Sequence, residues 1–477
     1  MSQNGHQIAP GHLGNLTDEQ EAKLRQLWSF GFQVLELYET ESRIYEEKKA
    51  RGEAVDPPKP AAAASSGGGW GLFGKKKGPT ELTHPKFPNS VKELQKLVPA
   101  DEPDRDELIK LAIEALDVYT PETARSILIE AVKHEHPDTL ALRFLRARKW
   151  NVLRAVLMLA KSVRWRVEDM KVDRVLMRQG EGHMFEQELH GAAGSRDKTF
   201  GKDFLNQMRW AKGFLHGTDR DGRPVNYIRA ARHRASDQSV ESLEKFTVYC
   251  IELARLSLQA PVEMGTIVFD LTGFSLSNMD YVPVKFLVQC FEANYPESLG
   301  CILIHNAPWG FGGVYRIIER WLDPVVASKV HFTNGAKEIA EYIAPEQLVS
   351  DLGGTNPWEY EYVPPVDGEN DRMDDTATRD ALLARRKELA AAFEDRTREW
   401  ARVAAASGAK APETAKVSAE RDAIAKQLAA NFWELDPYLR ARSLYDRLGV
   451  FQGNGKVDWS AAKKTQDQLK AEAGAAK

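Results

Sequence analysis

Hydrophobic residues near the start of the chain recur with the period of a helix. The sequence TDEQ, beginning at Thr17, is typical of a capping box at the start of a helix. Leu24, Trp28 and Phe32 then follow at intervals of four, which places them on one face. The pattern predicts an N-terminal helix within residues 1–50.

The middle of the chain alternates short β-branched apolar runs with amphipathic segments. Residues 86–180 have helical patterns throughout, whereas the alternation in residues 200–357 is typical of an α/β domain. The predicted strands lie near 210–216, 224–229, 265–271, 301–305 and 329–333. The predicted helices between them lie at 239–259, 280–293, 312–322 and 336–343.

The pattern of residues 295–329 predicts a turn, a buried strand, a loop and an amphipathic helix. The run 301–304 is apolar and β-branched, as in a strand covered on both faces. The loop after it gains backbone freedom from Gly310, Gly312 and Gly313. The helix that follows has one apolar face, formed by Val314, Ile317, Ile318, Trp321 and Leu322. The pattern predicts a lipid pocket closed by a hinged helix.

Two stretches of different composition divide the chain further. Residues 51–85 are rich in Pro, Ala, Ser and Gly and predict a disordered linker. Its segment Trp70–Lys77 joins aromatic to basic residues, which suits either a plain soluble linker or contact with an anionic bilayer. Residues 358–375 form an acidic linker, and 376–477 a helical C-terminal extension with helices near 377–405 and 415–447. We expect a protein cut before this extension, near residue 368, to fold.

Composition excludes several classes of protein. The chain has 477 residues, 43% of them hydrophobic, and a net charge of -4, which argues against general nucleic-acid binding. No apolar run approaches the length of a membrane span. The N-terminus lacks a signal-peptide pattern, and the three cysteines, Cys250, Cys290 and Cys301, are widely spaced. These features predict a cytoplasmic protein with reduced thiols.

A cationic helix is predicted to start at Pro137. The segment from Thr139 to Arg154 carries no acidic residue and five basic ones, namely Arg143, Arg146, Arg148, Lys149 and Arg154. Such a run is either a solvated helix face or a phosphate-binding site.

Six motifs, in order, resemble those of the CRAL-TRIO family, whose secretory-pathway members transfer phosphatidylinositol. They are LRFLRARKWN, TDRDGRPV, IVFDLTGFSLS, YPESLG, IHNAPWGF and LDPVVASKV. The resemblance covers roughly residues 95–357. It implies a small helical N-terminal domain in residues 86–180. It also implies, in residues 200–357, a mixed sheet with helices packed against one face. It also implies a hydrophobic pocket closed by a gate helix at 313–329.

The resemblance further implies a binding site for the inositol-lipid headgroup. The matching positions are Arg148, Lys149, Glu297, Gly300 and Lys329. Cationic donors suit a phosphodiester, and a carboxylate can accept hydrogen bonds from inositol hydroxyls.

This chain also departs from the family pattern. A threonine of the headgroup site is replaced by Val326. The tyrosines, serine and threonine that surround the choline phosphate in phosphatidylcholine-binding members correspond to Leu215, Asn226, Gly265 and Ile267. Since three of these four offer no polar side chain, the choline-phosphate site is predicted to be lost. The second ligand is then expected to be a different one, with an apolar lipid as a candidate.

Motifs of other functions are incomplete. The segment Gly310–Gly313 lacks the third glycine of a dinucleotide fingerprint, and no Gly-x-Ser-x-Gly elbow occurs. The turn from Asp219 to Gly222 has Ala230 where a calcium loop needs a glutamate, and the histidines lack zinc spacing. We therefore expect no metal, no cofactor other than a bound phospholipid, and no enzymatic activity.

The sequence favours a phosphatidylinositol-binding protein that exchanges lipids between membranes, located in the cytoplasm and peripherally at membrane surfaces. The alternative is a sensor that presents a different hydrophobic ligand, such as a sterol or isoprenoid, or a membrane-tethering adaptor. In either case the C-terminal helices are candidates for contact with a lipid kinase or another protein.

Overall fold

The computed structural model describes residues 8–53 and 88–475. The long helix α1 (Asp18–Ala50) begins at the predicted capping box. Thr17 Oγ1 accepts a hydrogen bond from the Gln20 amide at 3.2 Å, and Gln20 Oε1 accepts one from the Thr17 amide at 3.0 Å. The predicted linker from position 54 onward, with its Trp70–Lys77 segment, lies outside the described residues.

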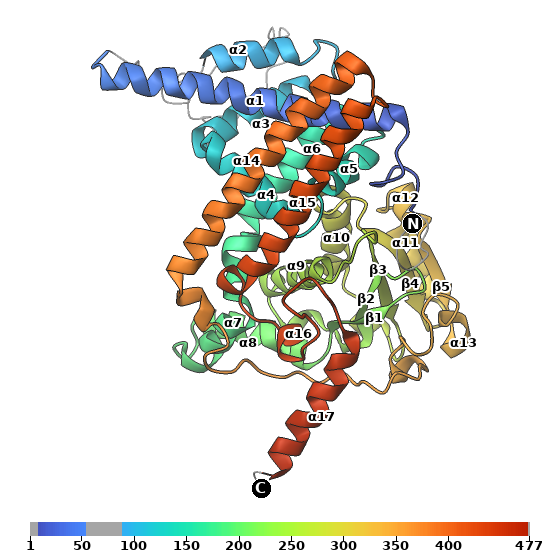
Figure 1. The fold of residues 1–477 in the computed structure, drawn as a ribbon. Coiled ribbons are helices and arrows are strands. Elements are labelled where there is room, and N and C mark those ends of the chain that lie inside the picture. The colour runs from blue at the N-terminus through green and yellow to red at the C-terminus, as the bar shows by residue number, and fades with distance from the viewer. Residues whose placement is uncertain (1–7, 54–87, 476–477) are drawn as a thin grey trace, which may run out of the picture.

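The described residues form one five-stranded sheet, which lies beside α9 (Val240–Leu256) and α10 (Tyr281–Gln289) and below the N-terminal helices in Figure 1. The helices before the sheet are α2 (Pro88–Leu97), α3 (Arg105–Val118), α4 (Pro121–Val132), α5 (Pro137–Ala147), α6 (Val152–Arg164), α7 (Arg178–His190) and α8 (Arg196–Arg209). Those within and after the sheet are α9, α10, α11 (Phe311–Glu319), α12 (Pro324–Ala327) and α13 (Gly335–Ile339). None of the described helices is long and apolar enough to cross a membrane.

The sheet is mixed, which confirms the predicted α/β class. Its strands lie side by side in chain order as β1 (Gly213–Thr218), β2 (Pro224–Arg229), β3 (Gly265–Asp270), β4 (Leu299–His305) and β5 (Val330–Thr333). The first pair is antiparallel and is joined by the predicted turn, where Asp219 Oδ1 accepts from the amides of Asp221 and Arg223. The other pairs are parallel and are connected through helices.

The two faces of the sheet have different neighbours. Side chains alternate along each strand, so Asn226 and Ile228 point to one face and Val225 and Tyr227 to the other. The first face borders the cavity described below. The second packs in the main core with residues after β5, including the fully buried Trp358.

The C-terminal extension is helical, as predicted, but is divided differently. It contains α14 (Thr376–Ser407), α15 (Pro412–Leu439), α16 (Leu444–Arg447) and α17 (Trp459–Ala475). The single helix expected at 415–447 is instead two helices. Helix α15 ends at Leu439, and a capping box formed by Ser443 and Asp446 starts α16. In Figure 1, α14 and α15 run side by side across the N-terminal helices, and α17 projects away from the body.

A buried ion pair joins this extension to the N-terminal helices. Arg421 of α15 is 1% exposed and donates two hydrogen bonds to Asp138 of α5, at 2.9 and 3.1 Å. The indole nitrogen of Trp28 in α1 donates to the same carboxylate at 2.7 Å. Burial raises the pKa of Asp138, but Arg421 and the other neighbours outweigh this effect and hold it below its usual value. Asp138 thus connects three segments that are distant in sequence.

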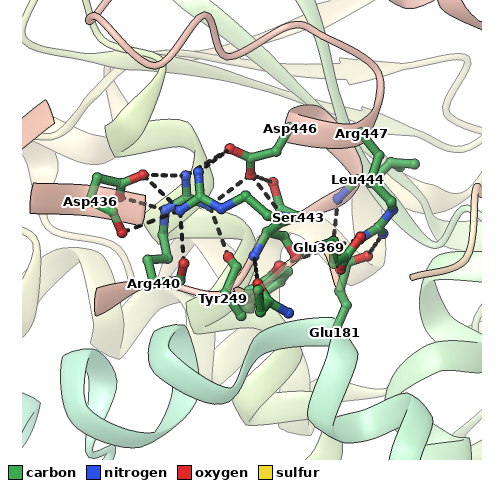
Figure 2. Close-up of polar contacts among 12 residues, drawn as sticks. Glu181, Tyr249, Glu369, Asp436, Arg440, Ser443, Leu444, Asp446 and Arg447 are labelled. Atoms are coloured by element: carbon green, nitrogen blue, oxygen red, sulfur yellow. Dashed lines mark hydrogen bonds and ion pairs between the residues drawn. The ribbon is translucent and has the colours of Figure 1, made fainter. Parts of the chain in front are cut away.

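A second buried network joins the extension to helices α7 and α9 (Figure 2). Glu181 of α7 is fully buried and accepts from Tyr249 of α9 and from the Leu444 amide, both at 2.9 Å, and from Arg447. Nearby, Arg440 lies between the carboxylates of Asp436 and Asp446, with contacts of 2.7 to 2.9 Å.

This packing argues against the expectation that the protein folds when cut near residue 368. Leu444, Tyr445, Leu448 and Val450 are buried in the same core as the sheet. The Tyr445 hydroxyl also accepts a hydrogen bond from the backbone amide of Leu215, on the edge strand, at 2.6 Å. Removal of the extension would expose an apolar face and a strand edge, so we expect the truncated protein to be insoluble.

Replacement of Arg421 tests this attachment. Arg421→Met leaves Asp138 buried without its cationic partner, so we expect the free energy of unfolding to fall by about 3 kcal/mol in chemical denaturation. The matched control is Arg402→Met in α14, because Arg402 is 68% exposed and pairs with Glu399 on the surface. We expect the control to change stability by less than about 0.5 kcal/mol. Equal effects of the two substitutions would show that the extension is not held by its buried contacts.

Candidate lipid-binding site

An apolar cavity of about 240 Å³ lies between one face of the sheet and helices α9, α10 and α11. The strands contribute Asn226, Ile228, Ile267, Phe269, Ile302 and Ile304. The helices contribute Leu243, Phe246, Ile251, Val284, Leu287 and Val288. The predicted hydrophobic pocket is therefore present, and its walls suit hydrocarbon chains.

The expected gate helix at 313–329 is two helices, not one. Helix α11 ends at Glu319, and α12 starts anew at Pro324. Proline cannot continue a helix but is favourable in its first turn, and Asp323 caps α12 by accepting from the Val325 amide at 2.8 Å. Of the predicted hinge glycines, Gly310 precedes α11 with φ 93°, whereas Gly312 and Gly313 lie in the first turn of the helix.

The gate covers one end of the cavity with part of its apolar face. Phe311 and Val314 are buried against Leu271 and Ile304 at the ends of β3 and β4. Ile318 and Leu322 line the cavity, but Ile317 is 43% exposed and points away from the core.

Trp321, between α11 and α12, connects the gate segment 311–327 to α10 through its ring contacts. Its ring packs edge-on against Tyr281, with 5.4 Å between ring centroids, and the Lys285 ammonium lies 4.8 Å from the Trp321 ring. Contacts of these two kinds contribute about 0.5–1.5 and 0.5–1 kcal/mol, which is small enough for the gate to open.

Three of the predicted headgroup residues, Glu297, Gly300 and Lys329, lie close together at the border of the cavity. The Lys329 ammonium donates to the Leu299 carbonyl at 2.7 Å and lies 3.8 Å from the Glu297 carboxylate. Both side chains are about one-fifth exposed. Leu299 and Val330, the neighbours of Gly300 and Lys329, line the cavity, so this polar cluster borders its apolar wall.

Arg223 also belongs to this cluster, although the sequence motifs did not identify it as a site residue. Its side chain lies against Gly300, where a Cβ atom would be only 2.5 Å from the guanidinium Nε. A side chain at position 300 would therefore displace Arg223, which also pairs with Asp219 and Asp221. A glycine within a strand indicates close approach of another group, and this signal was available in the sequence.

Lys329 has both cationic and anionic neighbours. Burial lowers the pKa of the Lys329 ammonium; Glu297 opposes this effect, and the neighbouring Arg146 and Arg223 add to it. Both arginines also pair with acids, Arg146 with Glu263 and Arg223 with Asp219 and Asp221. An anion bound here would stabilise the charged lysine. Arg146, which the sequence placed only in the basic run, thus lies near Lys329.

The basic residues between positions 143 and 154 differ in whether an acidic residue pairs with them. Arg143 pairs with Glu135, Arg146 with Glu263 and Arg154 with Asp104. Arg148 and Lys149 form no ion pair with any described acidic residue, nor a hydrogen bond with Glu297 or Lys329. Their role in headgroup binding stays a prediction.

Two of the four choline-phosphate positions line the cavity. Asn226 and Ile267 are adjacent in the register of β2 and β3 and belong to its wall. Leu215 is buried in the main core. Val326, in place of the family's threonine, also lines the cavity and adds to its apolar character.

Comparison with known proteins agrees with this architecture. Residues 209–354 match the CRAL/TRIO domain family, and residues 90–161 match the family of its N-terminal domain. A CRAL-TRIO domain-containing protein of Schizosaccharomyces pombe, C3H8.02, is 37% identical over 92% of each chain. The chain belongs to the CRAL-TRIO family. Both the recognition from sequence and the predicted fold are thereby confirmed.

Further relatives in the CRAL-TRIO family carry functional names. The phosphatidylinositol transfer protein CSR1 of Eremothecium gossypii is 34% identical over 93% of this chain and 99% of its own. The SEC14 cytosolic factor of the same organism is 29% identical, over 46% of this chain and 69% of its own. The first similarity includes the C-terminal extension, since it spans nearly the whole of both proteins.

The contacts of Trp321 predict how the gate opens. In Trp321→Ala, loss of about 1.5 kcal/mol of ring contacts should accelerate amide hydrogen exchange in α11 and α12 roughly tenfold. Mass spectrometry of peptides from 311–327 measures the change.

Trp309→Ala is the matched control for this experiment. Trp309 precedes the same helix but is fully exposed and makes no ring contact with the described residues. Its loss should leave the exchange rates unchanged. Equal exchange in wild type and Trp321→Ala would mean that Trp321 does not hold the gate.

Proposed function

We propose that the protein binds phosphatidylinositol and exchanges it between membranes, without catalysing a reaction. The observation that supports this most is the position of the Lys329, Arg223 and Glu297 cluster at the border of an apolar cavity. A phosphodiester would bind to the cations, and inositol hydroxyls would donate to the carboxylate. The acyl chains would occupy the cavity. A relative named phosphatidylinositol transfer protein adds weight to the proposal.

Transport requires the cavity because acyl chains are poorly tolerated in water. Each methylene exposed to water costs about 0.8 kcal/mol, so a lipid must remain covered in transit. In the proposed cycle the gate opens at a bilayer, the bound lipid leaves, and another enters. Exchange of one lipid for another avoids an empty apolar cavity at any stage.

A surface beside the gate suits contact with the bilayer. Trp309, before α11, is fully exposed, and Leu276, after β3, is 77% exposed. The two loops follow neighbouring parallel strands and are joined by a hydrogen bond of 2.9 Å from Asn306 to Thr272. Exposed Trp and Leu side chains favour the membrane interface, so the protein would act in the cytoplasm and bind membranes peripherally.

Substitution of the cluster tests the headgroup assignment. Lys329→Ala and Arg223→Ala each remove a charge-assisted contact worth about 1.5–3 kcal/mol, so phosphatidylinositol transfer between vesicles should fall ten- to hundredfold. Arg148→Ala should act in the same direction, because the Arg148 guanidinium donates only to the Ala147 carbonyl and forms no ion pair with a described acid.

Arg154→Ala is the control, because Arg154 lies on α6, does not line the cavity and pairs with Glu102 and Asp104. Phosphatidylcholine transfer should be weak in wild type and unaffected by these substitutions, since Leu215, Gly265 and Ile267 provide no polar side chain. Normal phosphatidylinositol transfer by both Lys329→Ala and Arg223→Ala would refute the headgroup site.

Substitution of Trp309 tests the membrane surface. Trp309→Ser removes about 1.5 kcal/mol of apolar burial in the bilayer, so binding to vesicles measured by sedimentation should weaken about tenfold. The melting temperature should not change, because the side chain is fully exposed in the protein. Leu189→Ser, also exposed but on α7, should leave vesicle binding intact. If both variants bind like wild type, the membrane contacts another face.

A further inference from the structure

Glu297 has a backbone conformation that its residue type disfavours. Its φ is 53°, in the left-handed region, where a side chain crowds the backbone and glycine is favoured. A residue keeps such a conformation only when its surroundings hold it there. The Glu297 carboxylate lies 3.8 Å from the Lys329 ammonium, so this conformation sets where the proposed headgroup site carries its negative charge.

The chain is anchored on both sides of Glu297. Tyr295, two positions earlier, is buried, and its hydroxyl donates to Oε1 of the fully buried Glu252 in α9 at 2.7 Å. On the other side, the Ser298 carbonyl accepts from the amide of Gly265, the first residue of β3, at 2.9 Å. Glu297 therefore lies on a short segment with both ends fixed.

Glu252 is itself held in place by buried cations. Arg166, just after α6, donates to both of its carboxylate oxygens, at 2.7 and 2.8 Å, and the Lys133 ammonium lies 3.0 Å away. Burial alone would raise the pKa of Glu252, but Arg166 and Lys133 outweigh it and keep that pKa well below its ordinary value. The carboxylate stays ionised, so the hydrogen bond from Tyr295 is charge-assisted.

Further contacts fix the Tyr295 ring and the residue before it. The Trp165 ring packs edge-on against the Tyr295 ring, with 5.9 Å between centroids, and the Arg255 guanidinium lies 6.0 Å from the same ring. The Ser162 hydroxyl of α6 donates to the Asn294 carbonyl at 2.9 Å. Groups on or next to α6 and on α9 thus hold the segment that leads into Glu297.

We propose that Tyr295 is a positioning residue for the headgroup site. Its hydrogen bond to Glu252 holds Glu297 in the left-handed conformation, which keeps the carboxylate where inositol hydroxyls can donate to it. The carboxylate then makes the site selective for inositol over phosphodiester headgroups that lack hydroxyls. This inference rests on the proposed function and adds the residue that orients its headgroup acceptor.

Two lipids that differ in headgroup hydroxyls test the proposal. The full-length protein is incubated with vesicles that contain phosphatidylinositol and phosphatidylethanol, with the same acyl chains and in equal amounts, and bound lipids are quantified by mass spectrometry. Both lipids carry one phosphodiester charge, but only the first has headgroup hydroxyls. Wild type should retain phosphatidylinositol about tenfold over phosphatidylethanol, and Glu297→Ala should bring this ratio towards one.

Tyr295→Phe should lower the same ratio at least about threefold, because it removes the hydrogen bond and keeps the ring. The amount of bound phosphatidylethanol should stay the same, since the cations Lys329 and Arg223 are unchanged. A general loss of stability would instead reduce the binding of both lipids.

Tyr249→Phe is the matched control. The Tyr249 hydroxyl likewise donates to a buried carboxylate, that of Glu181, at 2.9 Å (Figure 2), but Tyr249 does not line the cavity. We expect Tyr295→Phe and Tyr249→Phe to lower the melting temperature by similar amounts, and only Tyr295→Phe to change the lipid ratio.

Ser162→Ala keeps the test valid if Tyr295→Phe does not fold. It removes the hydrogen bond to the Asn294 carbonyl and should change the ratio in the same direction. The proposal is overturned if wild type shows no preference, if Glu297→Ala keeps the wild-type ratio, or if every folded variant of Tyr295 and Ser162 gives the ratio of Tyr249→Phe.

Phosphatidylinositol transfer between vesicles is measured on the same preparations. Normal transfer by a wild-type protein that shows no preference would refute only the positioning inference. A lipid ratio that responds as expected, without any transfer, would refute only the proposed exchange function.

Discussion

A largely parallel sheet must be covered on both faces, and the structure of this protein follows from that constraint. One face is covered at a distance by α9, α10 and the gate, which leaves the apolar cavity between them. The other face is closed by residues after β5 and by the C-terminal extension, whose Leu444 and Tyr445 belong to the main core. The extension is therefore part of the fold that supports the cavity.

The two kinds of contact in the molecule differ in strength, and this difference suits a lipid carrier. The N-terminal helices and the C-terminal extension are joined through fully buried charges such as Arg421 and Asp138, which are costly to separate. The gate is held by ring contacts of Trp321 and by a small apolar cluster. Separating the gate from its neighbours would therefore cost less free energy than separating the extension from the N-terminal helices.

The charged groups of the site lie at the border of the cavity, whereas its walls are mainly hydrocarbon. The Lys329 ammonium donates to the Leu299 carbonyl and lies 3.8 Å from the Glu297 carboxylate. Arg223 lies against Gly300 and pairs with Asp219 and Asp221. A ligand with a polar head and apolar chains matches this distribution.

The sequence by itself determined the features that depend on neighbouring residues. The capping box at Thr17, the order of strands and helices, and the left-handed Gly310 before α11 were all predictable, because caps, periodicity and glycine conformation are local. Tertiary structure alone decided which cations of the basic run remain free, since Arg146 is neutralised by Glu263, more than a hundred positions away. It also decided that the C-terminal helices belong to the core. Partners distant in sequence leave no local pattern, so the fold had to supply them.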